Sequence, residues 1–108
     1  MVKDKVEEMW NEVIKFNEKY FEGWRNRHPV FYSNAMAGEV GEICGGIKFV
    51  YGGGTHHKSV HKNDVGTECV DVFIYMILLM ESLGMDFKKF RELFDIKMNV
   101  LEGRMSER

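Results

Sequence analysis

Apolar residues recur three or four positions apart along most of the chain, and no segment of useful length alternates as a β-strand would. The pattern predicts an all-α protein with four helices. The first runs from about Val2 to Phe21 and is ended by Gly23. Its predicted inner stripe is formed by Val6, Met9, Trp10, Val13, Phe16 and Tyr20.

A second helix is predicted from about Asn34 to Tyr51, with Ser33 as its cap. The segment 25–32 before it contains Pro29 and is predicted to be a loop with at most one short turn. The second helix also carries Gly38, Gly41, Gly45 and Gly46, each of which lowers helix stability by about 0.5–1 kcal/mol relative to Ala. Either no helix forms here, or, as we favour, a neighbouring helix or a ligand approaches the backbone closely.

The third helix is predicted to start at a cap formed by Asp64 or Thr67 and to end at Leu83, before Gly84. It is apolar nearly all round from residue 69 to 80, so we expect it at the buried centre of a bundle. Asp86 is the predicted cap of a fourth helix, Phe87 to about Met105, with an inner stripe of Phe90, Phe94, Leu101 and Met105. The short turn at Gly84 favours antiparallel neighbours.

The 108 residues are expected to form a single domain, 1–108. The formal net charge of −2 gives no basic field for nucleic acid, and the short basic stretch at 25–28 is interpreted as a solvated loop. The most apolar run, 72–80, is nine residues, whereas a membrane span needs about 20. No secretory signal is apparent, so Cys44 and Cys69 are expected to be reduced, buried thiols of a cytoplasmic protein.

Four acidic residues stand in unexpected places. Glu39 and Glu42 are three apart beside the apolar stripe of the second helix, and Glu68 and Asp71 are three apart on the most apolar helix. Side chains at this spacing share one face of a helix, so packing of the two helices would gather all four carboxylates. Such a cluster needs basic partners or a divalent cation. No Lys or Arg interrupts the third helix from Glu68 to Ser82, which favours a metal, with Mg²⁺ preferred and Mn²⁺ possible.

Two other interpretations of the acids were weighed. A single acidic pair at this spacing is normally a solvated surface, but two such pairs beside glycines or apolar residues are hard to explain in that way. A ferritin-like di-iron site needs Glu-x-x-His pairs, and neither Glu39 nor Glu68 has a His three residues on.

The order of these residues is similar to a known family. Gly38-Glu39-Val40-Gly41-Glu42-Ile43, followed after 25 residues (43–67) by Glu68-Cys69-Val70-Asp71-Val72-Phe73-Ile74-Tyr75, resembles the MazG-like superfamily of all-α nucleoside triphosphate pyrophosphohydrolases. The resemblance covers about two thirds of the chain. It implies a MazG-like four-helix bundle that hydrolyses nucleoside triphosphates to monophosphate and pyrophosphate, with Mg²⁺ held by Glu39, Glu42, Glu68 and Asp71. Glu39 or Glu42 is further expected to orient the attacking water.

The resemblance also indicates substrate-binding residues. Tyr75 matches a position at the nucleotide in the dCTP pyrophosphatase branch, and Lys97 and Arg104 match cations of the last helix, although Leu101 replaces an Asn common in the family. Lys48 is a weaker phosphate candidate. Trp24 and His28 lie near the branch's base-pocket residues but out of register, and packing within the loop is an alternative role for both.

Three histidines, His56, His57 and His61, lie in a polar loop predicted over 52–66. A loop that closes over the triphosphate is favoured over a zinc site, because the spacing offers little preorganisation. Four helices of this size leave apolar side chains exposed, so a homodimer or a dimer of dimers is expected. The competing function is a non-catalytic helical module for dimerisation or nucleotide sensing.

Overall fold

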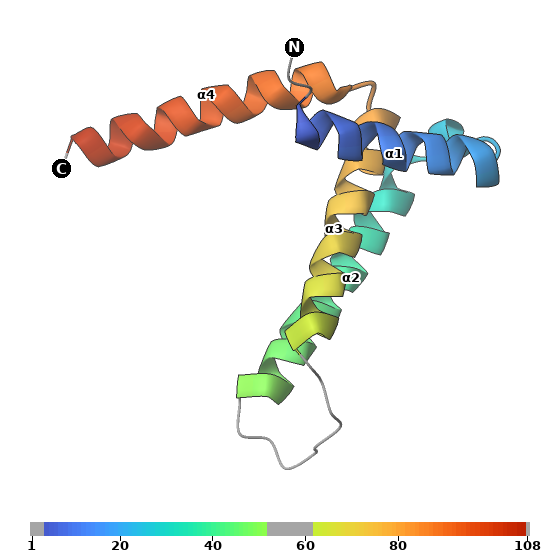
Figure 1. Cartoon of the computed structure of the whole chain (residues 1–108), viewed down its shortest axis with the longest axis horizontal. Helices are drawn as coiled ribbons and strands as arrows, with labels where there is room; N and C mark the ends of the chain where they lie inside the picture. Colours follow the sequence, from blue (N-terminus) through green and yellow to red (C-terminus); the bar gives the residue numbers. More distant parts are fainter. Residues whose placement is uncertain (1–3, 52–61, 108) are drawn as a thin grey trace.

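The computed structural model describes residues 4–51 and 62–107 and shows an all-helical chain (Figure 1). Its helices are α1 (Lys5–Tyr20), the 3₁₀ helix η1 (Trp24–Asn26), α2 (Pro29–Tyr51), α3 (Lys62–Ser82) and α4 (Phe87–Ser106). The described residues contain no β-strand, which confirms the all-α prediction. None of the helices in these two ranges has the length and apolar character needed to cross a membrane.

The ends of α1 and α4 follow local sequence signals. The Asp4 carboxylate caps α1 by accepting hydrogen bonds from the backbone of Val6 and Glu7, and Asp86 caps α4 as predicted, through a 3.0 Å bond from the Lys89 backbone. Gly23 and Gly84 have φ of 75° and 76°, a left-handed conformation that glycine adopts without a Cβ penalty. The turns after α1 and α3 therefore lie where the glycines predicted them.

The predicted starts of the two middle helices were wrong. Helix α2 begins at Pro29, because proline lacks the backbone N–H that a first helical residue leaves unpaired. Ser33 is already inside that helix and donates to the Val30 carbonyl. Helix α3 begins at Lys62, so Asp64 lies in its first turn and Thr67 bonds back to the Asn63 carbonyl.

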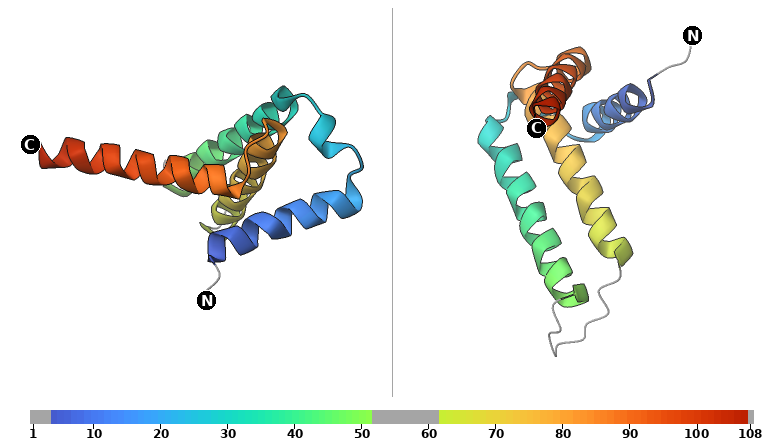
Figure 2. Two further views of the ribbon diagram at one scale, coloured as in Figure 1. Left: turned by 90° about the horizontal axis from the view of Figure 1, so that it is seen from above. Right: turned by 90° about the vertical axis from the view of Figure 1, so that its left-hand side faces the viewer.

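Helices α2 and α3 run antiparallel, side by side, while α1 crosses the far end of this pair and α4 projects away from it (Figures 1 and 2). The radius of gyration is 17.2 Å, against about 13 Å for a compact domain of this size. One copy of the chain therefore has four α-helices in its described parts but does not close into a four-helix bundle by itself.

The core is small and lies where α1, η1 and the start of α4 meet α3. One cluster contains Trp10, Ile77 and Phe87, and another contains Trp24, Tyr32 and Leu78. Some predictions of burial were wrong. Trp10, which lies on the predicted inner stripe of the first helix but was also counted among the apolar side chains that one chain leaves exposed, is 1% exposed. Both cysteines, predicted to be buried, are exposed. Phe16, Tyr20 and Phe21 are exposed as expected, and Phe73 and Met76 are half-buried.

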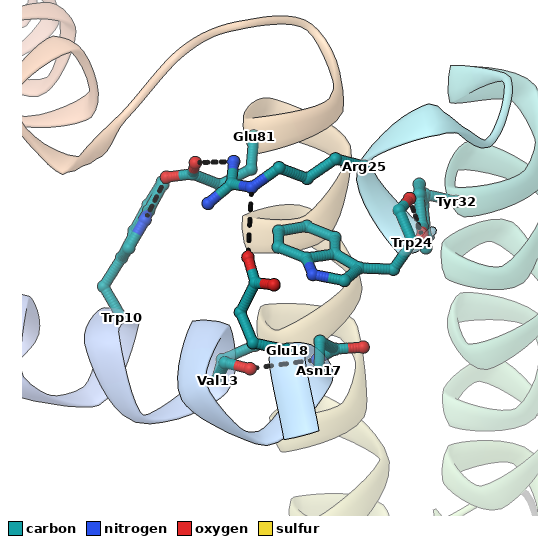
Figure 3. A network of polar contacts seen from close by, with 8 residues as sticks. All are labelled: Trp10, Val13, Asn17, Glu18, Trp24, Arg25, Tyr32 and Glu81. Carbon is teal, nitrogen blue, oxygen red and sulfur yellow. Dashed lines mark hydrogen bonds and ion pairs between the residues drawn. The ribbon is translucent and has the colours of Figure 1, made fainter. Parts of the chain in front are cut away.

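A polar network joins α1, η1 and α3 (Figure 3). Arg25 Nη1 donates to Glu81 Oε1 at 2.7 Å, and Arg25 Nε donates to Glu18 Oε1 at 3.3 Å. The hydrogen bond to Glu81 is the main cause that raises the pKa of Arg25. The interpretation of the segment 25–28 as only a solvated loop was therefore wrong for Arg25.

Candidate acidic site between helices α2 and α3

The antiparallel pairing of α2 and α3 brings the two acidic motifs to corresponding turns. Glu42 lies nine residues before the end of α2 at Tyr51, and Asp71 lies nine residues after the start of α3 at Lys62. At a rise of 1.5 Å per residue, each is about 13–14 Å from the end of its own helix nearest the connection between α2 and α3. Packing of the two helices was expected to gather all four carboxylates, and it brings the other three near enough to Glu39 for their charges to affect its pKa.

The electrostatics of Glu39 show that the other three acids of the cluster act on its carboxyl. The pKa of Glu39 is raised, first by burial, then by the charges of Glu42 and Asp71, by a hydrogen-bonding contact with Glu42, and by the charge of Glu68. Glu39 and Glu68 are both half-buried. Ionised carboxylates at this location repel each other, and no ion pair among residues 4–51 and 62–107 neutralises them.

Two carboxylate oxygens in this cluster are buried without a hydrogen-bond partner: Oε2 of Glu39 and Oε2 of Glu68. The ion pairs found among the described side chains all lie elsewhere and include none of the four acids. A buried acceptor without a donor lowers stability by about 1–3 kcal/mol, and more when it is charged. The site therefore presents oxygen atoms that a cation or a donor from outside the chain would satisfy.

The carboxylates are not gathered into a finished metal site. Within residues 4–51 and 62–107, no three His, Cys, Asp or Glu side chains are placed so that they hold a metal ion together. In chemical type the donor set still fits a hard divalent cation, since all four residues offer carboxylate oxygens and two of these oxygens are buried and unpartnered. Side-chain rotation would be needed to bring them into one ligand shell.

The glycines of α2 do not mark a close approach of α3. A Cβ built at Gly38, Gly41 or Gly45 would meet no atom within 4 Å. The close approach expected at these glycines is therefore not made by α3 of the same chain. Close approach by another helix or by a ligand stays a prediction.

Comparison of the chain with models of known protein families, with curated proteins and with solved structures found no match.

The structure brings Trp24 and Tyr75 to one cavity. This cavity has a volume of about 170 Å³ and is also lined by Asn17, Phe21, Arg27, Phe31 and Tyr32. Trp24 is 2% exposed, its carbonyl accepts a 2.6 Å hydrogen bond from Tyr32, and its Nε1 is buried without a partner. Tyr75 is one turn from Asp71 on α3, so the cavity adjoins the acidic site along the helix.

His28 has a structural role at the start of α2. Its Nδ1 accepts a 3.1 Å hydrogen bond from the backbone of Val30, and the ring is exposed and does not line the Trp24–Tyr75 cavity. Asn17, by contrast, is 6% exposed and lines that cavity, with its amide donating to the Val13 carbonyl. The analysis of the sequence missed Asn17, although a lone amide in line with Val13 and Tyr20 on the inner stripe was a signal.

The proposed phosphate-binding cations are not brought to the acids within one copy. Lys97 and Arg104 are exposed on α4, and that helix extends away from α2 and α3 (Figure 1). Lys48 is exposed on α2, six residues beyond Glu42 and so about 9 Å along the helix. His56, His57 and His61 lie outside the described residues, as does most of the loop predicted to close over the substrate.

Proposed function

We propose that this chain is a divalent-cation-dependent nucleoside triphosphate pyrophosphohydrolase of the MazG-like type, with its reaction site at the four acids between α2 and α3. The observation that carries the proposal is that the charges of Glu42, Glu68 and Asp71 all raise the pKa of Glu39, while Glu39 and Glu68 each have a buried oxygen without a partner. An arrangement that disfavours folding is retained in proteins mainly where it serves a function.

In this proposal the four carboxylates would hold Mg²⁺, with Mn²⁺ as a substitute. When bound, the cation supplies charge neutralisation at the phosphates and polarises the attacking water. Glu39 is suited to orient that water and take its proton, because burial and the neighbouring acids raise the pKa of its carboxyl. Glu42, one turn away on α2, adds to this effect through its charge.

Tyr75 and Trp24 supply an aromatic cavity next to the acids, which suits the base of a nucleotide. The cations for the phosphates would come from a second copy in a homodimer, because α4, the helix that carries Lys97 and Arg104, projects away from α2 and α3 of its own chain (Figure 1). Lys48, on the acid-bearing helix itself, remains a candidate within one chain.

The decisive experiment measures pyrophosphate release from a mixture of ribo- and deoxynucleoside triphosphates with Mg²⁺. The wild type should release pyrophosphate, and Glu39→Gln and Asp71→Asn should each lower kcat at least a hundredfold while the helical circular-dichroism signal is kept. Glu22→Gln, at an exposed acid between α1 and η1, is the matched control and should leave kcat unchanged. Full turnover by either site variant would refute the assignment.

A non-catalytic dimerisation or nucleotide-sensing module is the second candidate. It is favoured by one observation, that the acids of the described chain do not form a ready metal-ligand group. The same assay separates the two functions, because a sensor would bind a nucleoside triphosphate with Mg²⁺ and release no pyrophosphate.

A further inference from the structure

The surface of one copy is far larger than its mass requires. The chain exposes 8491 Å², whereas a compact folded protein of 12.6 kDa exposes about 6,200 Å². The excess of about 2,300 Å² is the area that each partner buries in an obligate homodimer. The excess surface of one copy is therefore large enough to form an interface with a second copy of this chain.

Part of this surface is a hollow between α1 and α3. The α1–α3 groove has a volume of about 590 Å³ and is lined chiefly by Met9, Val13, Phe16, Val70, Phe73 and Ile74. Its lining also includes one acid, Glu12. The groove is thus an almost wholly apolar channel.

Helix α4 has the complementary surface. After its first turn, its apolar side is exposed along its whole length, with Phe94 46%, Met98 48%, Leu101 38% and Met105 62% exposed. In the helical register Lys97 and Arg104 flank this apolar stripe on one side, and Asp95 and Glu102 flank it on the other. The apolar stripe itself is the surface that matches the apolar groove.

A chain cannot place its own α4 in its own groove. Phe87 and Phe90, in the first turn of α4, pack on Trp10, with ring centroids 5.8 and 5.3 Å apart. From that anchor α4 runs away from the body of α1 in every view (Figures 1 and 2). The helix that fits the groove is therefore available only from another copy.

We propose that two copies exchange α4, so that the part of this helix after its first turn lies in the α1–α3 groove of the partner. The exchange is reciprocal, as expected for a two-fold homodimer. Both grooves are then occupied, and the apolar side of both α4 helices is covered. The inference takes from the proposed function only that the chain acts as a homodimer, and it specifies which surfaces meet.

The first test uses light scattering on the wild type and three variants of the full chain. The wild type should have twice the mass of one chain at micromolar concentration. Leu101→Asp on α4 and Phe16→Asp in the groove should each yield monomers. Asn99→Asp, on the polar side of α4, should remain dimeric. A monomeric wild type, or a dimer that survives either Leu101→Asp or Phe16→Asp, would overturn the proposal.

Mixing the two monomeric variants distinguishes helix exchange from other dimers. The Phe16→Asp chain keeps an intact α4 and the Leu101→Asp chain keeps an intact groove, so an equimolar mixture should form heterodimers through one complete contact. Failure of the mixture to dimerise would contradict the pairing of these two surfaces. Both side chains are exposed in one copy, so the helical circular-dichroism signal should be kept; Phe94→Asp and Val70→Asp serve as second variants of the same two surfaces.

Hydrogen exchange of the wild type gives a measurement without substitutions. Backbone exchange should slow in α4 from residue 91 onward and in the groove-lining turns of α1 together, over the concentration range in which dimers form. Slowing in one of these segments without the other would overturn the proposal. A dimer without pyrophosphohydrolase activity would refute the proposed catalysis but not the exchange of α4 between copies. An active monomer would refute the exchange of α4 but not the proposed catalysis.

Discussion

The indole Nε1 of Trp10 donates a 2.8 Å hydrogen bond to Oε2 of Glu81, across 71 positions of the sequence (Figure 3). The other oxygen of the same carboxylate accepts from Arg25 at 2.7 Å. Trp10 is 1% exposed, and the side chain of Glu81 is 11% exposed. One carboxylate on α3 thus fixes both α1 and η1, and those two elements place Asn17 and Trp24 in the cavity beside the acidic site.

We expect Glu81→Ala to lower the free energy of unfolding by about 2–3 kcal/mol, because it leaves the buried Trp10 N–H without an acceptor and Arg25 without its main partner. Glu81→Gln keeps an acceptor for Trp10 and should lose only about 1 kcal/mol, the contribution of a partly exposed ion pair. Urea unfolding followed by circular dichroism measures both. Glu92→Ala, which removes an exposed pair with Lys89, is the control and should change stability by less than about 0.5 kcal/mol. Equal losses for Ala at positions 81 and 92 would contradict the structural role of Glu81.

The raised pKa of Glu39 implies a specific pH dependence of stability. Because the folded state binds the Glu39 proton more tightly than the unfolded state does, the ionised side chain destabilises the fold at neutral pH. This penalty is complete above the folded pKa and disappears as the pH falls through that pKa to the ordinary value of 4.5. In EDTA at pH 7, Glu39→Gln should therefore melt a few degrees above the wild type, and the difference should vanish near pH 4.

Thermal melts across this pH range check the prediction. Glu12→Gln, at an exposed acid outside the cluster, should track the wild type at every pH. A stabilisation of Glu39→Gln that is the same at pH 4 as at pH 7 would point to a cause other than the charge of Glu39.

A divalent cation should stabilise the folded chain if it binds among the acids. At a Mg²⁺ concentration a hundredfold above its Kd, the gain is about 2.7 kcal/mol, on the order of 10 °C in Tm for a domain of this size. Asp71→Asn or Glu68→Gln should remove this gain. Asp95→Asn on α4 removes an acid that is paired with Arg91 and should leave the gain intact. Differential scanning fluorimetry with and without Mg²⁺ measures this gain. An equal rise in Tm in the wild type and all three variants would show that Mg²⁺ does not bind at the acidic site.

Features of this structure that depend on residues close together in the sequence are predicted better than features that depend on residues far apart. The four helices, the cap at Asp86 and the turns at Gly23 and Gly84 follow from residues close in sequence, and the structure has them. The start of α2 was misplaced because Ser33 was favoured as a cap over Pro29 as a first helical residue. That error, too, is local, and the preference of proline for this position could have prevented it.

The arrangement of the helices relative to one another could not be predicted from these local patterns. Periodicity identifies the apolar side of α4 but not what covers it, so Lys97 and Arg104 were expected beside the acids and instead lie on a projecting helix. The ion pair of Arg25 with Glu81 joins residues 56 positions apart and leaves no local signal. The acidic pairs were predictable as a cluster because two antiparallel helices joined by one connection must bring equally distant turns together.

The cavity beside the acids gives the last prediction. Tyr75 lies one turn from Asp71, and with Trp24 it supplies aromatic faces to a space of about 170 Å³. If a base enters there, Tyr75→Ala should raise KM for the preferred triphosphate about tenfold, since an aromatic contact of about 1.4 kcal/mol is lost, with kcat changed less. Tyr75→Phe keeps the ring and should raise KM less than about threefold. Tyr20→Ala removes an exposed tyrosine that does not line this cavity and should leave KM unchanged, whereas an unaltered KM in Tyr75→Ala would place the base elsewhere.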